Sequence, residues 1–373
     1  MYIPPTWKLD HSEIGRRQLP PQMADFLPDV SLDAAGLVTI AEISAIARRT
    51  TLTGTSIIPD IFVLCPGLHR QQSASELSRG EFPAVAAMTT GYVFRVENAA
   101  TVCFLQRVGQ AGHLTTLRVT GPTIPDKPEK KRPPKPSFLK RWMSGMPGMT
   151  PMPGSREDLL ALGAYVSAVF ATPAVLIIYL WLQDWWGVFC LLALVLARLC
   201  NVIVIRRRCK ETGWKGASEP GVQGDLLVLL SGDCWIRIQG AVDDLKAVTA
   251  GQWMHDRTVG EDVTSAFATL LVYVSAVLVC NISKVGQVLL LSLLIVSAGL
   301  LFLANAATTT MHMNGRKLRV AGTPKRYHRR RDMADELIRE TGRTDWAKRL
   351  GMIVHEPVDC EEEAGTQDET VIL

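Results

Sequence analysis

Long apolar runs alternate with polar segments in the second half of the chain. The first two runs fill Leu159 to Ile205, interrupted only by the tip 181–186, and a second pair covers Thr264–Ile282 and Val285–Ala306. Each run is close to the ~20 residues with which a helix crosses a hydrocarbon core of ~30 Å. The pattern predicts an α-helical integral membrane protein with four transmembrane helices in two hairpins, 158–205 and 264–306.

Basic residues mark one side of this predicted membrane region. They precede the first run, follow the second as Arg206, Arg207 and Arg208, and follow the fourth between Arg316 and Arg331, whereas the two tips carry only Lys284. Because positively charged loops stay on the cytoplasmic side, both termini and the central loop are expected to be cytoplasmic. The tip tryptophans would then anchor the opposite interface: Trp181, Trp185 and Trp186.

The N-terminal part has a mixed pattern. Residues 1–30 are proline-rich and aperiodic, which predicts a disordered N-terminus, and Ser31–Arg49 has the spacing of an amphipathic helix. Ile57–Leu64, interrupted by Pro59, is typical of an edge strand. Three further β-rich runs predict an antiparallel meander: Tyr92–Val96, Thr101–Val108 and Leu114–Thr120. Together they predict a small cytosolic α+β domain over residues 31–121.

The remaining polar segments differ from one another. Residues 122–157 form a proline-rich basic linker, with Phe138–Met143 suited to contact anionic lipid headgroups. The cytosolic loop 206–263 contains a predicted β-hairpin, with strands in 226–230 and 234–239, followed by an amphipathic helix in 240–253. The tail 307–373 is first basic and then acidic, with two short helices at 332–340 and 344–350.

One segment carries a resemblance. The stretch Gly224–Trp253, placed between two apolar hairpins, resembles uncharacterised multi-span membrane proteins of filamentous fungi. The resemblance extends over the membrane half of the chain. It implies a shared architecture, and it brings no assigned activity and no functional residue.

The cysteines do not indicate a disulfide-bonded or metal-binding fold. Eight are scattered through the chain without a Cys-x-x-Cys pair, so neither a disulfide framework nor a zinc site is indicated. Cys209 follows Arg206–Arg208 directly and is either a palmitoylation site or an ordinary reduced thiol. Met311-His312-Met313 has soft ligands, yet two thioethers and one imidazole are more typical of a chance grouping than of a metal site.

Polar residues inside the apolar runs are few, and Arg198 is the charged one. It lies seven residues before Ile205, roughly 10 Å along a helix. One interpretation is that Arg198 snorkels to the cytoplasmic headgroups. The other is a polar layer in the cytoplasmic half of the bilayer, either a packing network or a shallow cavity, formed by Tyr165, Arg198, Asn201, Thr269 and Asn305.

No catalytic motif of the common hydrolase, nucleotide-binding or metalloprotease classes occurs in the sequence. The sequence therefore predicts a non-catalytic scaffold, tether or regulatory subunit, without cofactor or metal. The alternative is an oligomeric channel or transporter subunit. The expected partners are the lipid bilayer with its anionic headgroups, and other proteins or further copies of the chain. Small residues at four-residue spacing, such as Gly163 and Ser167, favour close helix packing. No nucleic-acid partner is expected.

Overall fold

The computed structural model describes residues 44–68, 70, 73–121, 156–210 and 216–353. The predicted disordered N-terminus, most of the helix expected at Ser31–Arg49, nearly all of the proline-rich linker and the acidic end of the tail lie outside the described residues. Within the described part, four helices are long and apolar enough to cross a membrane: α6 (Arg156–Leu182), α7 (Trp185–Arg208), α9 (Val259–Leu278) and α10 (Lys284–Ala307).

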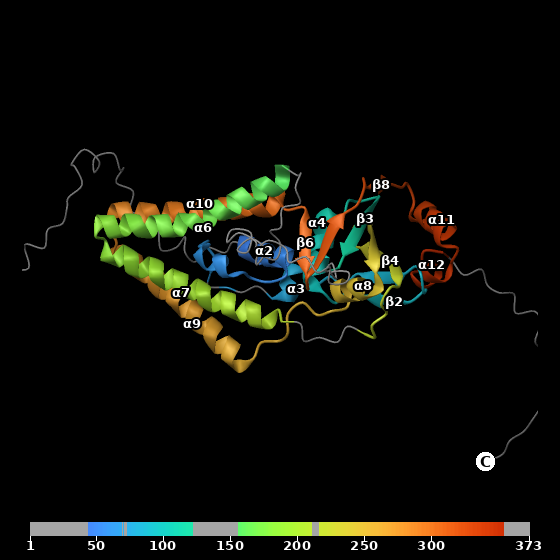
Figure 1. Cartoon of the computed structure of the whole chain (residues 1–373), viewed down its shortest axis with the longest axis horizontal. Helices are drawn as coiled ribbons and strands as arrows, with labels where there is room; N and C mark the ends of the chain where they lie inside the picture. Colours follow the sequence, from blue (N-terminus) through green and yellow to red (C-terminus); the bar gives the residue numbers. More distant parts are fainter. Residues whose placement is uncertain (1–43, 69, 71–72, 122–155, 211–215, 354–373) are drawn as a thin grey trace, which may run out of the picture.

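The four helices pack as two pairs, and each pair combines helices that are not consecutive in the chain. Helix α6 packs along α10, and α7 packs along α9. The two pairs meet at their tips and diverge toward the other end of the molecule (Figure 1). Small side chains allow the α6–α10 contact, because Ala164 and Ala168 are buried there against Leu301 and Ala304. Gly163 lies in open space instead, with no atom within 4 Å of a Cβ built on it.

The tips are fixed by hydrogen bonds. Asp184 accepts the backbone N–H of Gly187 at 3.1 Å and so caps α7, and it also accepts the Ser283 hydroxyl at 2.6 Å. The Tyr179 hydroxyl donates to the carbonyl of Gly286 at 2.6 Å. The connection between α6 and α7 and the connection to α10 are therefore held together at the end of the bundle.

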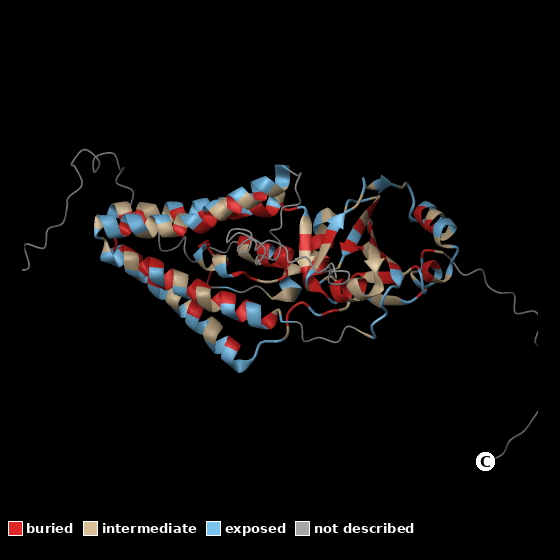
Figure 2. Cartoon of the chain, viewed as in Figure 1, coloured by how far each residue is buried: buried red, intermediate tan, exposed pale blue. Residues whose placement is uncertain are grey.

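Large apolar side chains cover the outside of the bundle. Figure 2 shows buried positions on the facing sides of the helices and exposed positions on the outer sides. The exposed ones include Phe170 at 61%, Ile177 at 67% and Val277 at 72%. An exposed apolar surface of this extent marks contact with a membrane or a partner, because it is unfavourable in water. Together with their length, this surface supports membrane association of the four helices.

The second body of the molecule is built on one eight-stranded sheet, as far as the described residues extend. Its order is β2-β1-β4-β5-β3-β7-β6, with β8 paired to β3, and all pairings are antiparallel except that of β3 with β5. The strands are β1 (Ala84–Ala87), β2 (Val93–Arg95), β3 (His113–Thr120), β4 (Gln223–Leu230), β5 (Cys234–Ala241), β6 (Thr310–Met313), β7 (Arg316–Val320) and β8 (Lys325–Arg326).

This sheet corrects the predicted domain organisation. The part of 31–121 that the structure describes does not form a domain of its own, because strands from the central loop and from the tail complete its sheet. We call the described residues 73–121, 216–254 and 308–353 the sheet domain. The predicted meander is wrong: β3 lies between β5 and β7, and Thr101–Val108 belongs to the helix α4 (Ala99–Val108).

Two local features explain the misassigned elements. Asn98 accepts the backbone N–H of Thr101 at 3.1 Å and so caps α4, although the following residues are rich in β-branched and aromatic types. The expected edge strand Ile57–Leu64 is instead the 3-10 helix η3 (Ile58–Phe62). There Asp60 accepts the N–H of Ile57 at 2.9 Å and closes the turn.

Other polar elements lie where the pattern placed them. The predicted hairpin corresponds to β4 and β5, which join through a turn with left-handed Gly232 and Asp233. The amphipathic helix corresponds to α8 (Val242–Thr249), and the tail helices to α11 (Arg330–Thr341) and α12 (Asp345–Arg349). The hairpin of β6 and β7 was not predicted.

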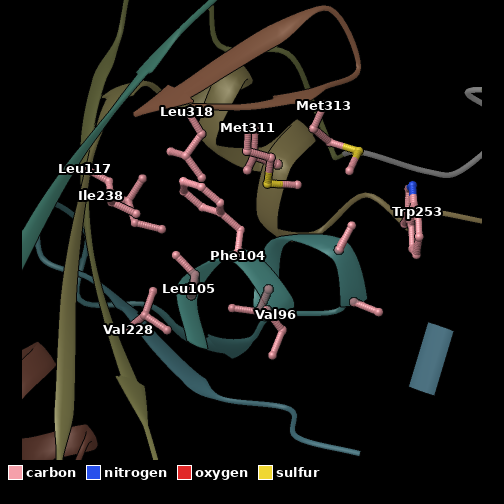
Figure 3. Packing of buried hydrophobic residues seen from close by; sticks show 14 of the residues in the cluster. Val96, Phe104, Leu105, Leu117, Val228, Ile238, Trp253, Met311, Met313 and Leu318 are labelled. Atoms are coloured by element: carbon pink, nitrogen blue, oxygen red, sulfur yellow. The ribbon is translucent and has the colours of Figure 1, made fainter. Parts of the chain in front are cut away.

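Helices cover both faces of the sheet. On one face Phe104 and Leu105 of α4 pack on Leu117, Ile238 and Leu318 (Figure 3). On the opposite face α11 and α12 bury apolar side chains against β4 and β5, among them Trp235, Met333, Leu337 and Trp346. The sheet domain therefore has three layers, and its core uses residues from all three chain segments.

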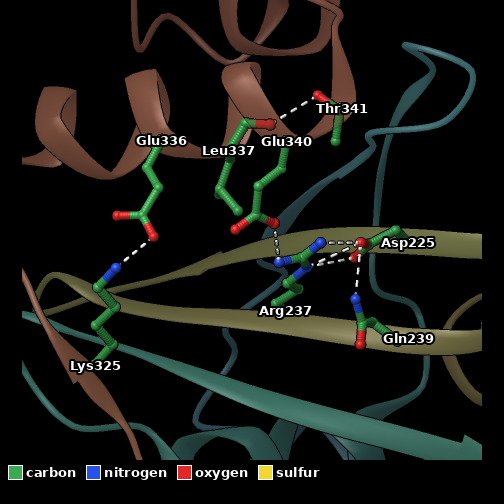
Figure 4. A network of polar contacts seen from close by, with 8 residues as sticks. All are labelled: Asp225, Arg237, Gln239, Lys325, Glu336, Leu337, Glu340 and Thr341. Carbon is green, nitrogen blue, oxygen red and sulfur yellow. Dashed lines mark hydrogen bonds and ion pairs between the residues drawn. The ribbon is translucent and has the colours of Figure 1, made fainter.

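A polar network attaches α11 to the sheet. Arg237 donates to both carboxylate oxygens of Asp225, with the shortest contact at 2.6 Å, and to Glu340 of α11 at 2.6 Å (Figure 4). Gln239 also donates to Asp225 at 3.1 Å. The Arg237 and Asp225 side chains are only 16% and 14% exposed, so solvent screens their contact weakly.

Replacing Asp225 by alanine is expected to destabilise the hairpin of β4 and β5, whose strands Asp225 and Arg237 connect. The change leaves the half-buried guanidinium of Arg237 without its bidentate acceptor, a loss of about 1.5–3 kcal/mol. Faster hydrogen exchange over residues 223–241 would reveal it. Glu340→Ala is the control, because Glu340 is 45% exposed and contributes less. Equal exchange rates in the two variants would contradict the assignment.

A candidate functional site between the helix pairs

A segment that precedes the sheet lies between the diverging helix pairs. Residues 44–68, here called the inserted segment, contain α2 (Ala45–Thr53) and η3, and Figure 1 shows α2 between α6–α10 and α7–α9. Helix α2 is polar in sequence, yet Arg49, Thr50 and Thr51 are buried. Such a segment is stable there only if the surrounding helices satisfy its polar groups.

The helices donate hydrogen bonds to η3. The Tyr165 hydroxyl donates to the carboxylate of Asp60 at 2.6 Å, and Nε of Arg198 donates to the backbone carbonyl of Asp60 at 3.0 Å. Further along α6, the Thr172 hydroxyl donates to the carbonyl of Phe62 at 2.6 Å. Carbonyl groups of irregular backbone are thereby satisfied within the protein, as a low-dielectric environment requires.

The ends of the inserted segment are held in the same way. Asn201 donates to the carbonyl of Leu68 at 2.7 Å, and Asn305 donates to the carbonyl of Ala45 at 2.8 Å. In α2, the Arg49 guanidinium donates to the Thr308 hydroxyl at 3.1 Å and lies 5.1 Å from the centre of the Tyr165 ring. Asp60 adds an attractive charge near Arg49.

The structure thus brings together four of the five residues in the predicted polar layer. Tyr165, Arg198, Asn201 and Asn305 all bond to the inserted segment. Thr269 lies apart: its hydroxyl donates to the Ser265 carbonyl within α9 at 3.0 Å, and it borders a surface hollow with Tyr273.

The structure also corrects the snorkelling interpretation of Arg198. Its side chain is 4% exposed and faces the Asp60 carbonyl inside the protein. Asp60, at the centre of the layer, was not predicted as a site residue, because it lies outside the apolar runs in a stretch expected to be a cytosolic strand. The sequence contained only an indirect indication of Asp60: polar residues inside a membrane span require buried partners, and such a partner had to lie outside the spans.

A small cavity adjoins the layer. It has a volume of about 50 Å³, enough for a few water molecules, and is lined by Arg198, Asn201, Arg208 and Trp253 among others. The Arg208 Nε donates to the His255 carbonyl at 3.1 Å, and the Trp253 indole donates to the Gly54 carbonyl at 2.9 Å. The cavity lies at the junction of helix α7, the inserted segment and the sheet domain.

Two other candidates from the sequence, Cys209 and the segment 311–313, pack in the core of the sheet domain. Cys209 packs against the main core of the sheet domain, and burial raises the pKa of its thiol to about 12, which argues against acylation through a thiolate. Met311 and Met313 are buried in the same core, while burial lowers the pKa of His312 to about 4 and keeps it neutral. No group of three or more potential metal-ligating side chains occurs among the described residues.

Comparisons with protein-family models, curated proteins and solved structures found no match to this chain. The geometry of the site is a polar joint: side chains of the helices bind the backbone of a segment that continues into the sheet domain. Its donors and acceptors bond to each other within the protein.

Proposed function

We propose that the protein is a multi-pass, non-catalytic membrane scaffold or regulatory subunit. The observation that carries the proposal is the polar layer. Tyr165, Arg198 and Asn305, from three different helices, donate to the inserted segment, and this segment is continuous with the sheet domain. Buried polar side chains in a bilayer are costly and are retained where they have a role. The role supported here is a stiff connection between bundle and domain.

The proposed orientation places the sheet domain in the cytoplasm. Arg206 and Arg207 end α7 at the end of the bundle next to the sheet domain, whereas the tips carry Lys284 alone. The positive-inside rule favours this arrangement. Trp181 and Trp185, 71% and 70% exposed near the tips, suit the opposite interface. Proteins that bind the scaffold would then be cytoplasmic.

The oligomeric channel is the weaker candidate. A conducting path needs polar atoms that face water or ions. In the described residues, the side chains of Tyr165, Arg198 and Asn201 are instead engaged with the inserted segment, and the adjoining cavity holds only about 50 Å³. No specific observation favours conduction.

Isolation of the tagged full chain from native membranes tests the proposal. We expect a distinct protein to co-purify at a fixed ratio. A suitable surface variant is Tyr92→Ser, because Tyr92 is 64% exposed and stacks on Phe94 of the edge strand β2 at 6.0 Å. Val222→Ser, at another exposed apolar position, is the matched control and should retain the partner.

Two results would overturn the proposal. One is turnover of a substrate by the purified chain. The other is ion conductance in liposomes that contain the chain alone. Loss of the partner with both surface variants alike would show that Tyr92 is not the docking position.

A further inference from the structure

A second hollow lies where α10 meets the sheet domain. It has a volume of about 510 Å³, and its wall comes from α2, α3 (Ala74–Leu77), α4 and the last two turns of α10. Figure 1 shows the end of α10 beside α4 and β6. Apolar side chains form part of the wall: Leu52, Leu77, Phe104 and Phe302.

Three arginines border this hollow, which we call the arginine pocket. Arg48, Arg79 and Arg107 come from three separate segments, and all are exposed. Burial raises the pKa of the neighbouring Cys103 thiol, and all three guanidinium groups act on that thiol in the opposite direction. The three guanidinium groups are therefore all near enough to act on the same side chain. Arg107 is held in place because its Nη2 donates to the carbonyls of Ala306 at 2.9 Å and Thr308 at 2.8 Å.

The two carboxylates at the pocket, Glu76 and Glu81, form their hydrogen bonds with residues other than these three arginines. Glu76 contacts Arg70 at 3.2 Å and caps α3 by accepting the backbone N–H of Ser73 at 3.3 Å. Glu81 accepts the Gln106 amide at 2.6 Å and the Ser231 hydroxyl at 2.7 Å. Among the described residues, no carboxylate lies within ion-pair distance of Arg48, Arg79 or Arg107. Three arginines outnumber the two carboxylates, Glu76 in the wall and Glu81, whose charge interacts with Arg79, so the pocket keeps a positive charge that an anionic ligand would neutralise.

The position of the pocket along α10 identifies the ligand class. Phe302 lies five residues before the end of the helix at Ala307, roughly 7–8 Å along its axis, and is 60% exposed. A helix that crosses a bilayer ends at the headgroup level, so the guanidinium groups would lie among headgroups and Phe302 among acyl chains. Guanidinium groups bind phosphate oxygens in a bidentate manner.

We propose that the arginine pocket binds the phosphate headgroup of an anionic phospholipid, with an acyl chain along Phe302. The site rests on the four helices lying in a bilayer and does not depend on the scaffold function. A lipid bound there would contact α2, α4 and α10 together, and so would connect membrane composition to the junction between bundle and sheet domain.

Binding of dioctanoyl phosphatidic acid to the purified full chain in detergent, measured by native mass spectrometry, tests the site. We expect Arg48→Gln combined with Arg79→Gln to weaken binding at least 30-fold. The double variant Arg95→Gln with Arg118→Gln removes the same charge from exposed strand positions and should change binding less than 3-fold. Phosphatidylcholine with the same chains should bind at least 10-fold more weakly to the wild-type protein.

Two further comparisons identify the source of the phosphate. Phe302→Ser should weaken the binding of phosphatidic acid at least 5-fold, whereas Phe189→Ser, at an exposed position of α7, should leave this binding unchanged. Inorganic phosphate should compete poorly. Competition by phosphate at the lipid's own concentration would overturn the lipid assignment in favour of a soluble anion. If the Arg95 and Arg118 control lost as much lipid binding as the Arg48 and Arg79 variant, the assignment of the lipid site to the arginine pocket would be overturned. Unfolding temperatures without lipid check that each variant is folded.

Discussion

Replacing Asp60 by alanine is expected to destabilise the folded protein by about 3–5 kcal/mol. The change removes the acceptor of the Tyr165 hydroxyl and the side chain that closes η3 through the N–H of Ile57. It also leaves the Arg49 guanidinium, which is 6% exposed, without the negative charge that opposes its burial. Thermal unfolding of the purified chain in lipid nanodiscs measures the loss.

A double-mutant cycle separates the charge from the packing. Arg49→Leu removes the buried cation, so the combined Asp60→Ala and Arg49→Leu variant should lose at least about 1 kcal/mol less than the sum of the single changes. Asp262→Ala, at the exposed start of α9, is the control and should change stability by less than about 0.5 kcal/mol. Additive losses would contradict a buried charge cluster around Asp60.

The membrane helices could be predicted because their signal is local. Each apolar run is long enough to span a bilayer by itself, and no partner segment is needed to recognise it. The hairpin of β4 and β5 is equally local, since Ser231, Gly232 and Asp233 supply its turn. Within such runs, Tyr165, Arg198 and Asn201 are conspicuous as polar residues, and two helices, α6 and α7, bring them to one segment.

The rest depends on contacts between distant segments. β3 lies parallel to β5, with Leu114 opposite Trp235, and two long helices separate these strands in the chain. Such a register is decided by packing in the assembled core. Asp60 shows the same limit: its neighbours Ile57 and Phe62 are typical of a strand, and only the polar groups of α6 and α7 explain its burial. The segment 101–108 is helical because its cap and the burial of Phe104 outweigh β propensity.

Replacing Gly54 by alanine is expected to loosen the contact between α2 and β6 of the sheet domain and to lower the free energy of unfolding by about 2–4 kcal/mol. Gly54 ends α2 with φ +73°, a left-handed conformation that costs an alanine about 1 kcal/mol. An added Cβ would also lie 2.5 Å from the backbone carbonyl oxygen of His312 in β6, so α2 or β6 must shift. Unfolding in nanodiscs and hydrogen exchange over 45–53 measure the change.

Gly315 gives a closely matched control for this prediction. It also has φ +73°, in the turn between β6 and β7, but no atom lies within 4 Å of its Cβ position. Gly315→Ala should therefore cost only the conformational part, about 1 kcal/mol. The difference between the two variants reports the contact of α2 with β6, because the backbone strain is the same in both. Equal losses would mean that the inserted segment does not pack closely against β6, and that Gly54 is held instead by the bond of its carbonyl to Trp253.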